Sequence, residues 1–321
     1  MKTSTQVLKL LIDADTYLSG QEIAQKLNLS RTAVWKAINT LKEAGYQIEG
    51  KPRVGYRFND NNKLSEAGIR KYLASDLDLD FEIYDTIDST NTRCSQVASA
   101  QTITKPLVVI ADTQSKGHGR YGRNFSSPKG SGIYLSILLV NTDPDFNPGL
   151  LTTAAAIAVT RTVEKLLHVD CKIKWVNDVL VDNKKITGIL TEGVADLENQ
   201  LLKNIIVGTG INYLTDPHTF PDDIKDRAGS LIEYVQKTGI SRNQFIAQYL
   251  NEFFNLYPDY KKAGFMDEYR KHSNTIGKDV VINRSGQITT GHVATIDNEG
   301  RIVLSSGQII SSGEVTKIRG I

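Results

Sequence analysis

The residues best suited to chemistry lie in a basic, glycine-rich stretch in the middle of the chain. No acidic residue occurs from Thr113 to Thr142, and the core of this stretch reads Gln114-Ser-Lys-Gly-His-Gly-Arg-Tyr-Gly-Arg-Asn-Phe125. Its glycines permit close approach of the backbone to a ligand, and the arginines at 120 and 123 carry forked donors suited to phosphate or carboxylate. It matches neither GxxxxGK[ST] nor GxGxxG after a strand. The stretch therefore predicts a flexible loop that folds around a polyanion, with a basic surface loop or a nucleic-acid contact as the alternative.

A lysine in the stretch Lys172-Ile-Lys-Trp-Val-Asn-Asp178 is the second candidate. Alternation in a strand places Ile173 and Trp175 on one face and the two lysines on the other. Lys174 directly precedes polar residues that are typical of a strand end at a cleft. A positive charge there would neutralise charge that develops on a transferring phosphoryl group, whereas Lys172 has the pattern of a lysine in water.

Two shorter segments carry polar side chains at the ends of predicted elements. Asp88-Ser-Thr-Asn91 begins a predicted helix, where a serine or threonine serves as a cap, a ligand contact, or both. Val207-Gly-Thr-Gly-Ile-Asn212 reads as a strand that ends in an amide suited to a base or amide edge. Cys94 and Cys171 form no CxxC motif or disulfide framework. The sequence also offers no Ser/His/Asp or Cys/His arrangement.

The first 58 residues predict a winged helix-turn-helix. Ser19 and Glu22 form a capping box, Ser30 caps a second helix, Gly45 ends it, and an alternating hairpin follows. This segment has nine basic and five acidic residues. The outward side chains of the second helix include types that read base edges and phosphates. They are Arg31, Thr32, Trp35, Lys36 and Asn39, and we expect Ser30, Arg31, Thr32 and Lys36 to contact DNA. The alternative is an ordinary solvated helix face.

The rest of the chain predicts two further domains, which makes the fold class α+β multidomain. After a polar linker at 59–63, residues 64–273 alternate between helical segments and short apolar strands, which indicates a mixed sheet with packed helices. The predicted strands include residues 107–111, 132–140, 172–176, 179–181, 188–192 and 204–207. Residues 274–321 carry short strands and glycine turns, which predict a small β-barrel. The predicted domains are therefore 1–63 with the linker, 64–273 and 274–321.

Composition favours a soluble cytoplasmic protein. The 321 residues include 38 Lys plus Arg and 36 Asp plus Glu, and no apolar run approaches the ~18 residues of a membrane helix. Asp13 and Asp15 interrupt the apolar start, so a signal peptide is not expected.

Taken in order, these motifs resemble those of biotin protein ligases. The shared features are Ser89-Thr-Asn91, the glycine-arginine loop, Lys174-Trp-Val-Asn-Asp178, Lys185-Ile-Thr-Gly-Ile-Leu190 and Gly208-Thr-Gly-Ile-Asn212. The loop followed by KWxND is the most specific part, and the helix-turn-helix makes the chain similar to the bifunctional type, the biotin operon repressors. The resemblance covers essentially the whole chain.

The resemblance implies a two-step reaction. The biotin carboxylate attacks the α-phosphorus of ATP, with Mg²⁺, to give biotinyl-5′-adenylate and pyrophosphate, and a lysine of a biotin carboxyl carrier domain then attacks the adenylate. It also implies a central domain like that of class II synthetases and a C-terminal SH3-like barrel. The implied partners are carrier domains of biotin-dependent carboxylases, operator DNA, and a second copy of the chain once the ligand orders the loop.

The resemblance also assigns site residues. Lys174 and Arg120 would be catalytic, Lys185 and Gly188 would shape the pocket wall, and Asp178 is a weak candidate for the metal, whose ligands are otherwise unknown. The implied biotin site comprises Ser89, Thr90, Asn91, Gln114, His118, Gly119, Arg120 and Lys174. The implied nucleotide site comprises Arg120, Arg123, Phe125, Lys174 and Asn212.

Three positions depart from the family pattern. The family usually has Arg where this chain has His118, Trp where it has Phe125, and Pro where it has Val176. Because a histidine is charged only below neutral pH, we expect adenylate retention to depend on pH. Phe125 keeps a stacking face but lacks the indole donor, and Val176 is expected only to adjust the strand end.

Other functions fit part of the same pattern. A metabolite-sensing repressor would keep the head and the pocket but would not need Lys174 beside an arginine loop. A lipoate or octanoate ligase shares a similar core, although the glycine-arginine loop favours biotin. An RNA-binding or synthetase-like protein is a more distant alternative.

Overall fold

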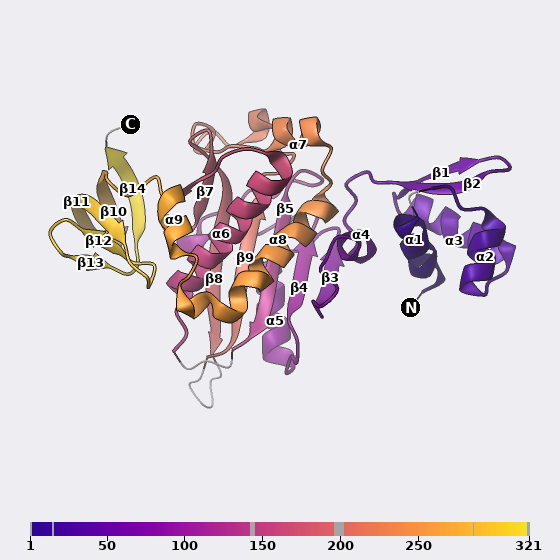
Figure 1. Cartoon of the computed structure of the whole chain (residues 1–321), viewed down its shortest axis with the longest axis horizontal. Helices are drawn as coiled ribbons and strands as arrows, with labels where there is room; N and C mark the ends of the chain where they lie inside the picture. The colour runs from indigo at the N-terminus through magenta and orange to yellow at the C-terminus, as the bar shows by residue number, and fades with distance from the viewer. Residues whose placement is uncertain (1, 15, 142–144, 196–201, 285, 320–321) are drawn as a thin grey trace. The chain divides into compact units, whose positions relative to one another are not determined.

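The computed structural model describes residues 2–14, 16–141, 145–195, 202–284 and 286–319. Contacts divide the chain into two units, Met1–Ala74 with Ile240–Gln248, and Ser75–Gly239 with Tyr249–Ile321. Figure 1 labels their elements. The predicted domain boundaries after residues 63 and 273 stay a prediction.

The first unit contains the predicted helix-turn-helix and hairpin. Its helices are α1 (Thr3–Asp13), α2 (Gly20–Leu27), α3 (Arg31–Glu43) and α4 (Glu66–Arg70), and β1 (Gln47–Lys51) pairs antiparallel with β2 (Gly55–Asn59). The capping box of Ser19 and Glu22 is confirmed, and Ser30 Oγ accepts from the backbone N–H of Ala33 at 3.1 Å. Val34 and Ile38 of α3 are buried in the core of this unit.

The second unit is built on the predicted mixed sheet. The strand order is β3-β4-β5-β9-β8-β7-β6, with β3 parallel to β4 and the other neighbours antiparallel. The strands are β3 (Asp80–Tyr84), β4 (Leu107–Ala111), β5 (Ile133–Val140), β6 (Lys172–Lys174), β7 (Asp178–Val181), β8 (Lys184–Ala195) and β9 (Leu202–Ile211). The predicted strand at 172–176 therefore ends earlier, at Lys174, and the predicted strand at 188–192 is longer at both ends.

Helices pack on this sheet and hold its central strands (Figure 1). They are α5 (Thr90–Ala100), α6 (Pro148–Leu167), α7 (Ile232–Thr238), α8 (Arg242–Leu256, which begins in the first unit) and α9 (Met266–His272). Helix α6 is alanine-rich and buried over most of its length, as expected for a helix that is apolar on nearly all sides. Among the described residues, no helix combines the length and apolar character needed to cross a membrane. The cytoplasmic location stays a prediction.

The C-terminal strands form an antiparallel sheet rather than the predicted closed barrel. Their order is β13-β12-β11-β10-β14, and the described strands show no pairing that joins β13 to β14. The bounds are β10 (Asp279–Arg284), β11 (Gln287–Ile296), β12 (Ile302–Leu304), β13 (Ile309–Ile310) and β14 (Glu314–Arg319). A barrel needs its two edge strands to pair, and β13 offers an edge of only two residues.

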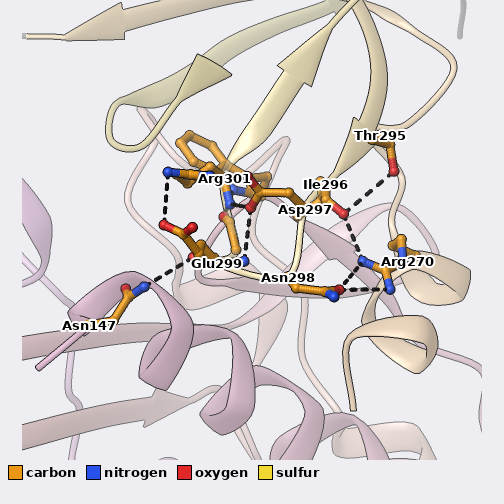
Figure 2. A network of polar contacts seen from close by, with 10 residues as sticks. Asn147, Arg270, Thr295, Ile296, Asp297, Asn298, Glu299 and Arg301 are labelled. Atoms are coloured by element: carbon orange, nitrogen blue, oxygen red, sulfur yellow. Dashed lines mark hydrogen bonds and ion pairs between the residues drawn. The ribbon is translucent and has the colours of Figure 1, made fainter. Parts of the chain in front are cut away.

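The turn between β11 and β12 anchors this sheet to the helices and to β6. Asn147 donates to the carbonyl of Glu299, and Arg270 donates to the carbonyl of Ile296 at 2.8 Å (Figure 2). Trp175, directly after Lys174, donates from its indole to the carbonyl of Gly300 at 2.8 Å. The C-terminal sheet is thereby held beside the strand that carries the candidate lysine.

Candidate functional site

The glycine-arginine loop folds as a short hairpin-like turn. The backbone N–H of Phe125 donates to the carbonyl of Gly117 at 2.9 Å, and that of Gly119 donates to the carbonyl of Arg123 at 2.8 Å. The tip bends through Tyr121 and Gly122, whose φ angles are 59° and 69°. A left-handed backbone is easily adopted by glycine, so Gly122 suits the tip.

Both loop arginines are engaged by groups from other parts of the second unit. Arg120 donates to Asn177 Oδ1 at 3.2 Å and to the carbonyl of Gly313 at 3.0 Å. Arg123 forms a two-pronged ion pair with Glu314, which raises the pKa of the Arg123 guanidinium. Gly313, just before β14, and Glu314, the first residue of β14, therefore supply acceptors to the two arginines.

Lys174 is half-buried at the end of β6, while Lys172 on the same strand is exposed. Burial lowers the pKa of the Lys174 ammonium, and the carboxylates of Asp178 and Glu314 oppose that shift. Within the part of the chain that the structure describes, no hydrogen bond or ion pair engages its Nζ. The lysine thus brings a partly desolvated positive charge without a bonded counter-ion.

The two arginines and the lysine meet around the same acidic groups. Asp178 and Glu314 both act electrostatically on Arg123 and on Lys174. Arg120 joins them through the residue that precedes Asp178. Lys174 is opposite Asp178 in the pairing of β6 with β7, Arg120 contacts Asn177, and Arg123 pairs with Glu314. The structure therefore places the three cations around neighbouring residues, while contact with a ligand phosphate stays a prediction.

A second polar cluster lies at the start of α5. Ser89 is buried and caps the helix, accepting from the backbone N–H of Thr92 at 3.5 Å. Thr90 donates to Gln114 Oε1 from its backbone at 2.8 Å and from its hydroxyl at 3.2 Å. Gln114 Nε2 donates in turn to Ser127 Oγ at 3.0 Å. The predicted residues 89, 90 and 114 are thus adjacent, with fixed side chains.

Asn91 extends this cluster onto the sheet. Ser136 on β5 donates to Asn91 Oδ1 at 2.5 Å and to Thr90 Oγ1 at 2.7 Å, while Asn91 Nδ2 donates to Glu192 Oε2 on β8 at 2.6 Å. A Cβ on Gly208 would lie 2.1 Å from Asn91 Oδ1. The glycine on β9 is therefore needed for the amide to reach this position.

Phe125 packs over glycines of the two central strands. A Cβ on Gly210 would lie 2.5 Å from the Phe125 ring, and one on Gly188 would lie 3.6 Å from the ring and 3.1 Å from Lys185 Nζ. Tyr134 meets the ring edge-on at 6.3 Å between centroids. The glycines thus leave the space on the sheet surface that the aromatic ring occupies.

His118 and Asn212 have contacts that do not involve the three cations. His118 lines a groove of about 620 Å³ together with Asn91 and Glu192, and its Nδ1 lies 3.4 Å from the carbonyl of Lys116. Asn212 is buried, and its Nδ2 donates to the carbonyl of Gly229 at 2.9 Å. Its side-chain donor thus braces the backbone in this structure.

The candidate DNA-reading residues share the outward side of α3. Arg31, Thr32 and Lys36 are exposed there, directly after the cap Ser30. The buried side chains of the helix face the core on the opposite side. The placement matches the prediction, while DNA contact itself stays a prediction.

Sequence reasoning missed three groups that organise the site: Ser136, Glu192 and Glu314. Ser136 interrupts the apolar strand IYLSILLV, so an isolated hydroxyl in a buried run was the available signal. Glu192 is an acidic residue inside strand β8, whose sequence is KKITGILTEGVA. Glu314 carried no local signal, because its partner Arg123 is 191 residues away in the chain.

Comparisons with known proteins agree with this geometry. Residues 83–212 match the biotin/lipoate A/B protein ligase family, and residues 3–57 match a helix-turn-helix domain. The bifunctional ligase/repressor BirA of Bacillus subtilis is 33% identical over 296 residues, covering 91% of this chain and 90% of that protein. A biotin–[acetyl-CoA-carboxylase] ligase of Mycobacterium tuberculosis is 29% identical over 223 residues, covering 66% of this chain and 79% of that protein. The biotin protein ligase of Aquifex aeolicus in complex with biotin and ATP superimposes with a TM-score of 0.59 at 26% identity, covering 74% of this chain and 97% of that one. The chain belongs to the biotin/lipoate A/B protein ligase family and, within it, to the bifunctional ligase/repressor proteins.

Proposed function

We propose that this protein makes biotinyl-5′-AMP from biotin and ATP, transfers the biotin to a lysine of a biotin carboxyl carrier domain, and represses transcription in response to biotin. The observation that carries the ligase activity is the placement of Arg120, Arg123 and Lys174 around two short segments, 177–178 and 313–314. A helix-turn-helix on the same chain as this family domain supports the repressor activity.

The first step needs charge stabilisation more than proton transfer. A biotin carboxylate oxygen forms a bond to the α-phosphorus as the bond to pyrophosphate breaks, so negative charge builds up on the phosphoryl oxygens. Arg120 and Arg123 would hold the phosphates through their forked donors. Lys174 would supply a positive charge, and its partial burial would strengthen the attraction between that charge and the phosphoryl oxygens.

In the second step the uncharged amine of the carrier lysine attacks the acyl carbon. A C–N bond forms, the bond between the acyl carbon and the phosphate oxygen breaks, AMP leaves, and the amine nitrogen gives up one proton to solvent. The mixed anhydride is already activated, so the chain needs to hold it in place and keep water out. No nucleophilic side chain of this protein is required.

The polar cluster at the start of α5 is the proposed site for the ureido ring of biotin. Ser89, Thr90, Asn91 and Gln114 offer hydroxyl and amide groups that can both donate and accept, as a ureido ring requires. Phe125 is proposed to stack on adenine above the low glycine surface of β8 and β9. Asn212 is proposed to border the nucleotide, on the strength of its position at the end of β9.

The Mg²⁺ that accompanies ATP fits one carboxylate of this site. The described residues include no cluster of three or more His, Cys, Asp or Glu. Mg²⁺ in such sites commonly takes one or two carboxylates together with substrate phosphates and water. Asp178 Oδ1 lies 2.6 Å from Lys185 Nζ and forms an ion pair with it, so a metal ion would bind Oδ2 or displace the Lys185 ammonium. We propose Asp178 as the protein ligand, where the ion would offset phosphate charge.

The remaining expectations complete the proposal. Binding of biotinyl-5′-AMP would order residues 114–129 and favour a homodimer that binds a two-fold operator. This dimer would form through a sheet edge, and a carrier domain of a biotin-dependent carboxylase would compete for that edge. The proposal also includes a division into three domains with a synthetase-like central domain, and a cytoplasmic location. Size-exclusion profiles that do not change with biotin plus ATP would count against the dimer.

Mass spectrometry tests the enzyme activity. Purified protein is incubated with biotin, MgATP and a biotin carboxyl carrier domain, and we expect the carrier to gain one biotin, with the gain lost in the Lys174→Ala variant. A sensor without ligase activity would bind biotin but leave the carrier unmodified. Labelled lipoate in competition with biotin separates a lipoate ligase, because the account predicts that biotin alone is transferred.

A further inference from the structure

Trp35 is an exposed aromatic residue on the outward face of α3. Its side chain is 56% exposed, whereas its neighbour Val34 is 1% exposed and points into the core. Across the described ranges of the chain, the structure gives the Trp35 indole no hydrogen bond or aromatic contact. A large apolar surface in water is unfavourable, and the core of this unit is complete without it.

The surroundings of Trp35 favour a polyanionic partner. Arg31 lies one turn before it, Lys36 directly after it, and Asn39 one turn later. No acidic residue occurs from Ile23 to Lys42, although four residues of that segment are Lys or Arg. The indole is therefore the apolar centre of a basic helix face, which complements DNA rather than an apolar protein surface.

We propose that Trp35 reads sequence by packing against the 5-methyl group of a thymine in the major groove. The idea rests on the proposed repressor function and deepens it. Side chains such as Arg, Thr and Asn can read hydrogen-bonding edges, but the thymine methyl is an apolar feature of the groove and is read by apolar contact. Trp35 is the large apolar residue of α3 that is exposed to make that contact.

Replacement of thymine by deoxyuridine tests this contact because it removes only the methyl group. The preferred duplex is first selected from a random pool with the full chain, biotin and MgATP, and each thymine is then replaced in turn. We expect that replacement of thymine at one position in each half-site weakens binding by about fourfold, which corresponds to the free energy of burying one CH₂ group. The Trp35→Ala variant should bind more weakly and bind the dT and dU duplexes equally.

Val54→Ala is the matched control. Val54 is 47% exposed in the turn between β1 and β2 of the same unit, so its loss removes an exposed apolar residue without altering α3. This variant should keep the dT preference. Ligase activity and circular dichroism of Trp35→Ala should match the unsubstituted protein, which excludes a folding defect.

Fluorescence gives an independent readout. The chain has two tryptophans, and the other, Trp175, is only 3% exposed. Acrylamide should therefore quench mainly Trp35, and the selected duplex should protect it. Unchanged quenching on DNA binding would overturn the proposal.

The selection experiment distinguishes failure of the thymine contact from failure of the proposed repressor function. If the pool yields no enriched sequence, the repressor function and the inference fail together. If a sequence is enriched but wild type binds every dU duplex as tightly as dT, or Trp35→Ala retains the preference, only the inference is overturned. Loss of dimerisation in Trp35→Ala with an intact dT preference would assign the indole to a second copy of the chain, and would also overturn it.

Discussion

Replacement of Lys174 by methionine should lower activity and raise stability at the same time. The half-buried ammonium has no bonded counter-ion among the described residues, and burial lowers its pKa. A lowered pKa means that the folded chain holds the charge at a cost, so removing that charge should stabilise the fold at neutral pH. Methionine keeps the chain length and apolar character of the lysine stem.

The expected loss of activity follows from the charge. A unit charge about 4 Å from a developing phosphoryl charge is worth ~4 kcal/mol at an effective dielectric constant of ~20, which suits a partly exposed site. At ~1.36 kcal/mol per tenfold change in rate, this upper value corresponds to about 10³. Removal of single oxyanion donors in enzymes costs ~10²–10³ in kcat. We expect kcat for adenylate formation to fall by about 10²–10³.

The stability gain has a defined pH dependence. Between the lowered folded pKa of Lys174 and its ordinary value of 10.5, the unfolded chain binds more protons, so wild-type stability rises with pH. The advantage of Lys174→Met should therefore be present at neutral pH and disappear above the ordinary lysine pKa. Denaturant unfolding of both proteins across this range measures it.

Lys172→Met is the matched control for both measurements. Lys172 lies on the same strand but is exposed, so its replacement should leave pyrophosphate release and stability nearly unchanged. The reasoning is refuted if Lys174→Met retains more than a tenth of wild-type kcat, or if the two variants lose activity equally.

Three other predictions concern separate parts of the molecule. Gly210→Ala would place a Cβ 2.5 Å from the Phe125 ring, so the ring must move. The KM for ATP should then rise by about tenfold, with a smaller change in the KM for biotin. The same KM for ATP in the variant and the wild type would contradict the stacking role. Ser30→Ala removes the cap of α3 and should destabilise the first unit by ~1 kcal/mol, measured by thermal unfolding against Ser4→Ala as a control. Replacement of His118 by Arg, the residue that the family usually has there, should slow the release of bound adenylate because arginine adds a permanent charge and a forked donor, and an unchanged release rate would remove that role.

Local signals in the sequence carried the prediction of the first unit. The capping box joins residues only three apart, and the cap at Ser30 acts within one turn. Such contacts are fixed by spacing along the chain, so the helix boundaries follow from residue types. The apolar strands β4 and β5 were equally clear because they are buried throughout.

The parts that were missed depend on distant partners. Strand β3 was not predicted because it alternates acidic residues with apolar ones. Glu82 on this strand forms an ion pair with Arg93 of α5, and no local sequence pattern indicates that pair. Glu314 reaches the arginine loop only through the folding of the C-terminal sheet. A barrel was predicted from short strands and glycine turns, but closure depends on the length and pairing of the two edge strands.

The glycine-arginine loop and the strand that carries Lys174 were predicted to form one site because both offer positively charged side chains suited to phosphate. Forked cations and an isolated lysine both suit phosphate, and the structure brings them together around Asp178 and Glu314. Sequence alone did not indicate that the loop arginines already contact acceptors of the same chain.

A crystal structure of the protein with biotinyl-5′-AMP tests the central claim most directly. The account predicts that the guanidinium groups of Arg120 and Arg123 and the ammonium of Lys174 each lie within about 4 Å of the phosphoryl oxygens, with the ureido ring beside Ser89 and Gln114. An adenylate phosphate that contacts neither loop arginine nor Lys174 would contradict it.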